Sequence, residues 1–121
     1  MVGNYLIFFV SYFLIVLSVV GHGVLAIKLT KSNVSIEEIG FVGLVGIFFL
    51  ILYSYATHFF ISHGYLHNIV FISIGLLSIY YFRSKILTKR NSIFLFSIFS
   101  IIFLAFIIFK THDDFGYYHF P

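Results

Sequence analysis

Residues 39–61 read IGFVGLVGIFFLILYSYATHFFI, and this stretch decides the fold class. It contains no charged side chain and is long enough for one α-helix to cross a bilayer core, which takes roughly 17–25 apolar residues. Glu37 and Glu38 precede it, where acidic side chains suit a helix N-terminus. Ser35 is expected to cap this helix, with Glu38 completing a capping box. The stretch therefore predicts a transmembrane helix.

Three further apolar runs flank this one, and they cover residues 5–27, 66–82 and 93–109. They stop at Lys28, Arg83 and Lys110, and Asn91 or Ser92 is expected to cap the last. A cleaved signal peptide is the alternative for the first run, but that run has no positively charged segment before it. The sequence predicts an all-α polytopic membrane protein with about four transmembrane helices. Residues 1–121 are expected to form one unit without a separate soluble domain.

The composition agrees with a chain that lies in lipid. Of 121 residues, 61% are hydrophobic and 9% are charged, whereas soluble domains carry roughly a quarter charged residues. Cysteine is absent, which excludes disulfides and thiolate metal sites. The net charge of +3 comes from basic residues between the runs, a pattern that favours membrane orientation over nucleic-acid binding.

The distribution of basic residues predicts the orientation. The first and third connections hold Lys28, Lys31, Arg83, Lys85, Lys89 and Arg90. On the other side lie the N-terminus, the turn at 62–65 and the segment from Lys110 onward. Since basic loops stay in the cytoplasm, both termini are expected to be extracytoplasmic.

Small residues recur along the second run. At 100° per residue, Gly40, Gly43, Gly46, Ser54 and Thr57 fall within about a third of the helix circumference. Small side chains let helix backbones approach closely in lipid. We expect this stripe to be a helix-packing seam.

Histidines gather near the turn between the second and third runs, at His58, His63 and His67. Imidazoles at one membrane surface can bind a metal or carry protons. Gly64 interrupts the His63–His67 spacing and no carboxylate accompanies them, which favours interfacial residues at the tip of a helical hairpin. His22 lies between Gly21 and Gly23, and we expect it to be a packing or interfacial residue.

The chain changes character after Lys110. Asp113 and Asp114 are the only aspartates, and Tyr118 and His119 follow them. Adjacent carboxylates repel, so such a pair suits cation binding or proton transfer. The alternative is that two exposed acids only solubilise this segment.

The string DDFGYYHFP, residues 113–121, resembles the start of the first large extracytoplasmic loop of GT-C-class glycosyltransferases. The chain is also similar to the N-terminal region of uncharacterised bacterial multi-span proteins related to that class. Their pattern would correspond here to the glycine-rich second run, Asn68, and Asp114 followed by Tyr118, His119 and Pro121.

The resemblance implies a polyprenyl-phosphate sugar donor, used in envelope polysaccharide synthesis at the outer face of a bacterial inner membrane. It assigns the role of catalytic base or metal-binding carboxylate to Asp114 first and Asp113 second, so a divalent metal is a conceivable cofactor. Enzymes of this class have many more spans. Residues 110–121 are therefore expected to begin a truncated loop, and this fragment alone is expected to be inactive.

Two alternatives to this interpretation stay open. One is a complete small four-helix membrane protein with a structural or partner-binding role, whose interface would be the stripe on the second run. The other is a small membrane protein that handles a metal, haem or protons through His58, His63, His67 and His119.

Overall fold

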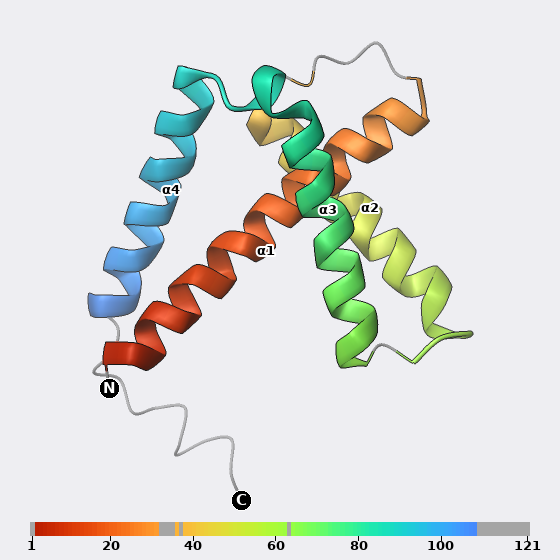
Figure 1. Ribbon diagram of the computed structural model, residues 1–121, viewed down its shortest axis with the longest axis horizontal. Coiled ribbons are helices and arrows are strands. Elements are labelled where there is room, and N and C mark those ends of the chain that lie inside the picture. The colour runs from red at the N-terminus through yellow and green to blue at the C-terminus, as the bar shows by residue number, and fades with distance from the viewer. Residues whose placement is uncertain (1, 32–35, 37, 63, 109–121) are drawn as a thin grey trace, which may run out of the picture.

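The computed structural model describes residues 2–31, 36, 38–62 and 64–108, and these residues form helices without any strand (Figure 1). The helices are α1 (Val2–Leu29), α2 (Ile39–His58), α3 (Tyr65–Ile86) and α4 (Lys89–Ile108). Within the described residues, three segments are long and apolar enough to cross a membrane, namely Leu6–Leu29, Ile39–His58 and Tyr65–Ile86. The predicted all-α membrane fold is confirmed.

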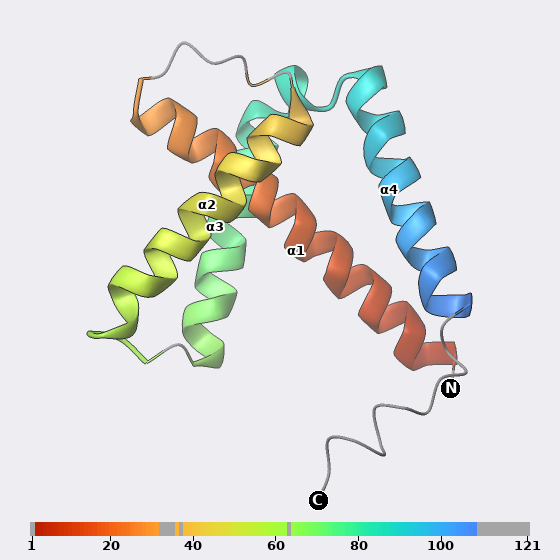
Figure 2. The same cartoon turned by 180° about the vertical axis from the view of Figure 1, so that it is seen from behind.

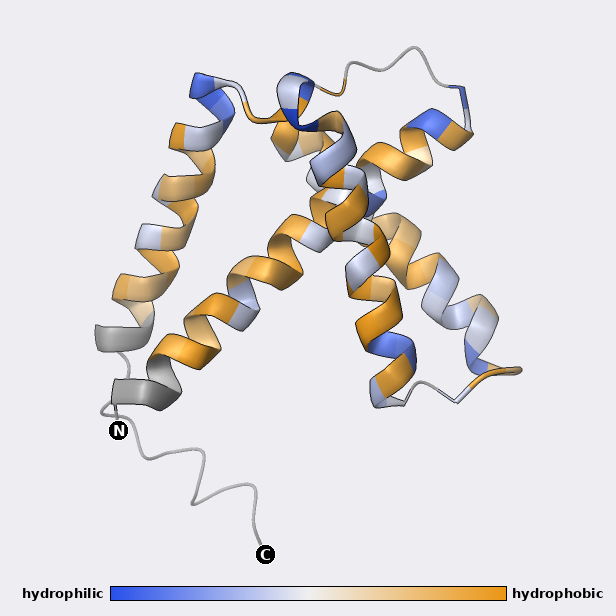
Figure 3. Cartoon of the chain, in the orientation of Figure 1, coloured by the Kyte–Doolittle hydropathy of each residue, from blue (hydrophilic) through white to orange (hydrophobic). Residues whose placement is uncertain are grey.

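The four helices alternate in direction, so the connections fall at two ends of the molecule (Figure 1). The end of α1, the start of α2 and the connection from α3 to α4 lie at one end, which Figure 3 shows as the more hydrophilic end. The start of α1, the α2–α3 turn and the end of α4 lie at the other end. All the basic residues of the two connections are therefore separated from the α2–α3 turn by the length of the helices.

The long helix α1 runs obliquely between α2 and α3. Figure 1 shows α3 in front of α1, and Figure 2, from behind, shows α2 in front of it. Both helices pack closely on α1, whereas α4 meets α1 mainly through side chains. The buried apolar core includes Val20, Val24, Val42, Ile79 and Phe99. The centre of α1 thus organises the bundle.

The start of α2 differs from the predicted one. The amide of Val42 donates to the carbonyl oxygen of Glu38 at 3.0 Å, so the helix begins at Ile39 with Glu38 at the N-cap. The Glu38 side chain makes no capping hydrogen bond. A capping box needs Glu38 three residues inside the helix, so the predicted box is wrong in register. Ser35, its other member, lies outside the described residues.

The start of α4 is also earlier than predicted. Thr88 is the cap, because its hydroxyl accepts from the amide of Asn91 at 3.3 Å and its carbonyl accepts from the amide of Ser92 at 2.9 Å. Asn91 is buried inside the first turn, and its Nδ2 donates to the carbonyl oxygen of Ile86 at 2.7 Å. The predicted cap at Asn91 or Ser92 is therefore wrong. Asn91 instead ties the end of α3 to the start of α4.

Most of the helix surface stays open. At most 33% of any of the three spans is buried inside the protein, and the exposed side chains include large apolar ones such as Leu44, Phe48, Leu77 and Phe96. A surface of this kind is costly in water and suits hydrocarbon. The fold is that of an open helical bundle with its centre on α1.

Candidate functional site

The centre of the bundle is built by glycines that let three backbones meet. Gly21 of α1 faces the backbone of Gly75 in α3, and Gly23 of α1 faces the carbonyl of Val42 in α2. Gly46 of α2 in turn faces the carbonyl of Val19. A methyl group at any of these glycines would overlap a neighbouring backbone. Small residues permit this close approach in a membrane, where packing replaces the hydrophobic effect between helices.

The predicted small-residue stripe of α2 divides into two parts. Gly46 is buried against α1, and a Cβ at Gly43 would lie 3.9 Å from a side chain of α1. Gly40 has nothing within 4 Å of such a Cβ. Ser54 is exposed and Thr57 is half-buried, and the Thr57 hydroxyl donates to its own helix at the carbonyl of Tyr53, 2.8 Å away. The structure thus brings only part of the stripe to a helix contact.

His22 lies in this glycine crossing and is 1% exposed. Its Nδ1 lies 2.9 Å from the carbonyl oxygen of Ser18, and because a carbonyl only accepts, Nδ1 carries the hydrogen. The hydroxyl of Ser18 donates to the carbonyl oxygen of Ile72 in α3 at 3.1 Å. The Nε2 of His22 is buried without a hydrogen-bond partner. The site therefore holds one unsatisfied ring nitrogen at the meeting point of three helices.

A column of aromatic rings connects His22 with the α2–α3 end of the molecule. The His22 ring stacks on Phe71 with centroids 4.3 Å apart, and Phe71 stacks on Tyr53 at 4.1 Å. The hydroxyl of Tyr53 lies 3.1 Å from Nε2 of His67, and Nδ1 of His67 lies 3.4 Å from Oδ1 of Asn68. With Nδ1 donating to Asn68, Nε2 of His67 accepts from Tyr53. The column joins α1, α2 and α3 and places a histidine at each of its ends.

This arrangement can orient and hold side chains more readily than it can bind a metal. Among the described residues, no three His, Asp or Glu side chains lie close enough together to hold a metal ion. His67 is engaged with Tyr53 and Asn68, while His63 lies outside the described residues. An unsatisfied imidazole nitrogen in an apolar surrounding can accept a hydrogen bond from a water or a small donor. His22 is thus a packing residue with a spare acceptor.

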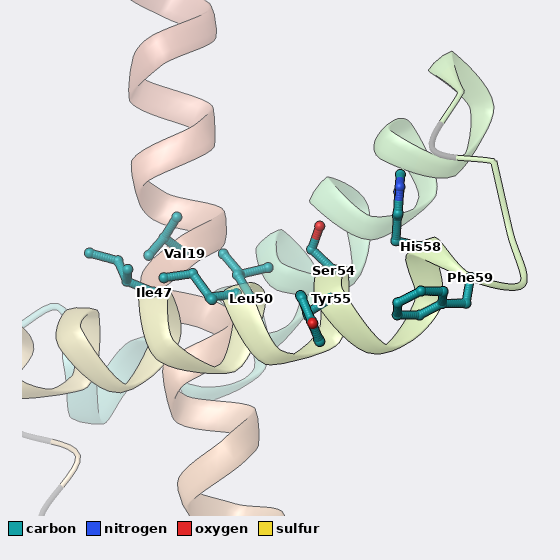
Figure 4. Close-up of a pocket in the computed structure, with 8 residues that line it drawn as sticks. Val19, Ile47, Leu50, Ser54, Tyr55, His58 and Phe59 are labelled. Atoms are coloured by element: carbon teal, nitrogen blue, oxygen red, sulfur yellow. The ribbon is translucent and has the colours of Figure 1, made fainter.

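An open apolar groove runs along α2, with a volume of about 590 Å³ (Figure 4). Val19 of α1 closes one end of it, and α2 provides the other lining residues. Figure 4 shows Ser54 and His58 pointing to the same side of α2, while Tyr55 and Phe59 lie on another side. Of the three histidines near the turn, His58 lines this groove and His67 contacts Tyr53, while His63 lies outside the described residues.

The predicted catalytic residues Asp113 and Asp114 lie outside the described residues. The same holds for Tyr118, His119 and Pro121 of the motif. The structure describes the chain up to Ile108 of α4, which ends at the side opposite to the basic connections (Figure 1).

Sequence reasoning missed part of the crossing. Gly75 and Ser18 received no role, although both lie against the His22 ring or its neighbours. Gly75 stands alone in an apolar run and so gives no pattern to recognise. The Gly21-His22-Gly23 triplet was the available signal, because two glycines around a polar residue inside a span indicate close backbone contact.

Comparison of the chain with protein-family models, curated proteins and solved structures finds no match.

Proposed function

We propose that the chain is the N-terminal membrane unit of a glycosyltransferase resembling the GT-C class. In this proposal the four helices hold the segment that begins at Lys110 at the extracytoplasmic face of a bacterial inner membrane. The observation that supports it is the alternation of the helices. The end of α4 lies opposite to both basic connections, and basic connections favour the cytoplasm (Figure 3).

The chemistry of the proposal rests on the acidic pair. Asp114 acts as the general base, taking the proton of an acceptor hydroxyl as that oxygen attacks the anomeric carbon and the polyprenyl phosphate departs. Asp113 assists, through its charge or through a divalent metal. A carboxylate suits this work because it accepts a proton when held against the acceptor oxygen. The substrates are a polyprenyl-phosphate sugar and a hydroxylated acceptor.

The orientation can be tested without removing native thiols, because the chain has no cysteine. Single cysteines are introduced as Ser62→Cys, Ser84→Cys and His112→Cys, and intact cells are treated with a membrane-impermeant maleimide. We expect labelling at positions 62 and 112 in intact cells, and at position 84 only after permeabilisation. Labelling of position 84 in intact cells would show that the orientation is the reverse of the expected one, which removes the basis of the proposal.

The activity is tested in membranes from cells that carry the native gene. Release of polyprenyl phosphate from a labelled sugar donor is measured for the native protein, for Asp114→Asn and for Asp113→Asn. Loss of a general base lowers the rate by roughly 10²–10⁴-fold, so we expect that loss for Asp114→Asn and a smaller one for Asp113→Asn. Ser62→Ala is the control with unchanged transfer. An Asp114→Asn rate equal to the native rate contradicts the assignment.

A second function, association with other membrane segments, is favoured by one observation. Gly40 of α2 is exposed, and a Cβ at this position would meet no atom within 4 Å. The side chains of Phe41 and Leu44 next to it are also exposed. A partner helix can approach the backbone at such a place. The change Gly40→Leu tests this, because it spares the contact of α2 with α1. The variant and the native protein are each extracted from their own membranes and compared by native mass spectrometry. We expect the native protein to carry a partner chain that the variant has lost. If the variant keeps the partner chain, this face is excluded as the interface.

A further inference from the structure

The imidazole of His22 is enclosed by groups from three helices. Its ring stacks on Phe71 of α3 and on Phe49 of α2, with centroids 4.3 Å and 6.0 Å away. Nδ1 donates to the carbonyl oxygen of Ser18 in α1, whereas Nε2 is buried and has no hydrogen-bond partner among the described residues. A neutral imidazole fits this place, because it has one N–H to donate and leaves only one acceptor unused.

A second proton on this ring would find no acceptor at the crossing. Protonation turns Nε2 into a donor and gives the ring a positive charge. The ring is faced by the phenyl groups of Phe49 and Phe71, by Gly75 of α3 and by Ser18. The Ser18 carbonyl already accepts from Nδ1, and the Ser18 hydroxyl donates to the carbonyl of Ile72. Aromatic faces attract a cation, but they do not replace its hydration.

No carboxylate of the described residues lies where it could pair with a protonated His22. Glu38 is the only one, and it precedes Phe49 on α2 by 11 residues, which is about 16 Å of helix. The other titratable groups of the aromatic column are Tyr53 and His67, which lie beyond Phe71 and are hydrogen-bonded to each other. A charge on His22 would therefore be buried without compensation, which is strongly unfavourable.

The glycine contacts keep water away from this nitrogen. Gly21 and Gly75 bring the backbones of α1 and α3 together, and Gly23 and Gly46 do the same for α1 and α2. A charged ring becomes favourable only where water or a polar partner reaches it. Nε2 is closed to solvent in this arrangement, so water reaches it only when α2 or α3 moves away from α1.

We propose that the crossing of α1, α2 and α3 is a pH-sensitive contact, which is closed while His22 is neutral and is opened by protonation of Nε2. Opening moves α2 and α3 away from the centre of α1 and gives water access to the aromatic column. This switch concerns the described helices alone and does not rest on the proposed glycosyltransferase function.

The first test measures the stability of the full chain against pH. Unfolding by sodium dodecyl sulfate is followed by near-ultraviolet circular dichroism from about pH 8 to about pH 5, where an accessible imidazole takes up its proton. The unfolded chain then binds one proton that the closed crossing excludes. We expect the folding equilibrium constant of the native chain to fall roughly tenfold for each pH unit below about 6.5.

Two changes at His22 should remove this dependence. His22→Phe keeps a ring between Phe49 and Phe71, and His22→Gln keeps a polar side chain; neither side chain titrates in this range. The matched control is His58→Phe, which removes an exposed imidazole from α2 and should leave the dependence as in the native chain. The proposal is overturned if native stability does not change with pH, if the His22 variants keep the native dependence, or if the control loses it.

The second test measures the opening itself in lipid and needs no change at His22. Because the chain has no cysteine, spin labels can be attached to Ile7→Cys and Ser62→Cys, both at exposed positions. The start of α1 and the α2–α3 turn lie at the same end of the molecule, so the distance between the labels reports the angle of the crossing (Figure 1). We expect this distance in lipid nanodiscs to change when the pH is lowered to about 5. An unchanged distance overturns the proposal.

Discussion

The two contact regions of α1 are built on opposite principles. Toward its C-terminal half, α1 crosses α2 and α3 through glycines, with backbone against backbone. Toward its N-terminal half, α1 meets α4 through rings, where Phe99 lies 4.6 Å from Phe13 and 6.2 Å from Phe9 between centroids. The first region has no space for an added methyl group. The second is an interdigitation of large side chains that can shift.

The two regions show that one bundle can combine a rigid helix crossing with a helix contact that can shift. In lipid, the transfer of apolar side chains between neighbours gains little, so the tightness of packing decides stability. Backbone contact at glycines gives many atom pairs at optimal distance, and dispersion adds up over them. Rings with centroids 4.6–6.2 Å apart contribute through a few tilted or edge-to-face contacts. We therefore expect the crossing to unfold last and α4 to separate first.

The largest effect is expected at the crossing. Gly23→Ala places a methyl group in the space of the Val42 carbonyl, so α1 and α2 must move apart. We expect the free energy of unfolding to fall by about 2–3 kcal/mol. It is measured by titration with sodium dodecyl sulfate, followed by near-ultraviolet circular dichroism of the nine tyrosines. Gly40→Ala is the control, because a Cβ there meets no atom within 4 Å, and it should not destabilise the protein and should stabilise α2 by at most about 1 kcal/mol. Equal effects of the two changes would contradict the crossing.

A smaller effect is expected at the α4 contact. Phe99→Ala removes the ring that meets Phe9, Tyr12 and Phe13, and we expect a loss of about 1–2 kcal/mol. The value is below that for a soluble core because lipid replaces the lost ring. The same titration measures it, with Phe96→Ala, at a 75% exposed position, as the neutral control. A loss above that of Gly23→Ala would reverse the order of the two regions.

Substitutions at His22 separate the contribution of its ring from that of its polar nitrogen atoms to the stability of the crossing. His22→Phe keeps a ring on Phe71 and removes the unpartnered Nε2, but it loses the hydrogen bond to the Ser18 carbonyl. These effects oppose each other, so the free energy of unfolding should change by at most about 1 kcal/mol. His22→Ala, which also removes the ring, should destabilise more. A strongly destabilised His22→Phe variant would mean that Nε2 has a partner in the membrane.

The smallest effect is expected at the α2–α3 end. Tyr53→Phe keeps the stack on Phe71 and removes the hydroxyl that donates to His67. Interhelical hydrogen bonds in membranes average about 0.6 kcal/mol, and we expect a loss of that size in the same titration. Tyr55→Phe, at a 73% exposed position, serves as the control. A loss of several kcal/mol would show that the column is a main determinant of stability.

The helices could be predicted because each appears in the sequence as a long apolar run without charged residues. The stretch 39–61 and α2 differ only at the end, where the helix stops at His58. The site was harder to predict, because a helix in lipid is apolar on its inner and outer faces alike. Hydrophobic periodicity, which marks the buried face of a soluble helix, is then weak. Gly46 was assigned to a packing seam from its spacing, whereas Gly75 has no companion to reveal it.

The caps show a different limit of sequence reasoning. Thr88, Asn91 and Ser92 are all acceptable cap residues, and the order among them depends on where α3 ends. The buried hydrogen bond from Asn91 to Ile86 decides it, and this bond exists only because the chain turns sharply there. Choices of this kind are made by tertiary structure.

The apolar part of α1 has a consequence for the lipid around the protein. Leu6–Leu29 has 24 residues, which at ~1.5 Å per residue give about 36 Å of helix. This exceeds a hydrocarbon thickness of about 30 Å, so the helix must tilt or the bilayer must thicken. The glycine crossing fixes the angle of α1 against α2 and α3, which removes the tilt of a single helix as a free response to hydrophobic mismatch. The mismatch of α1 is then met by the three packed helices together, through a common tilt or a change in the surrounding bilayer.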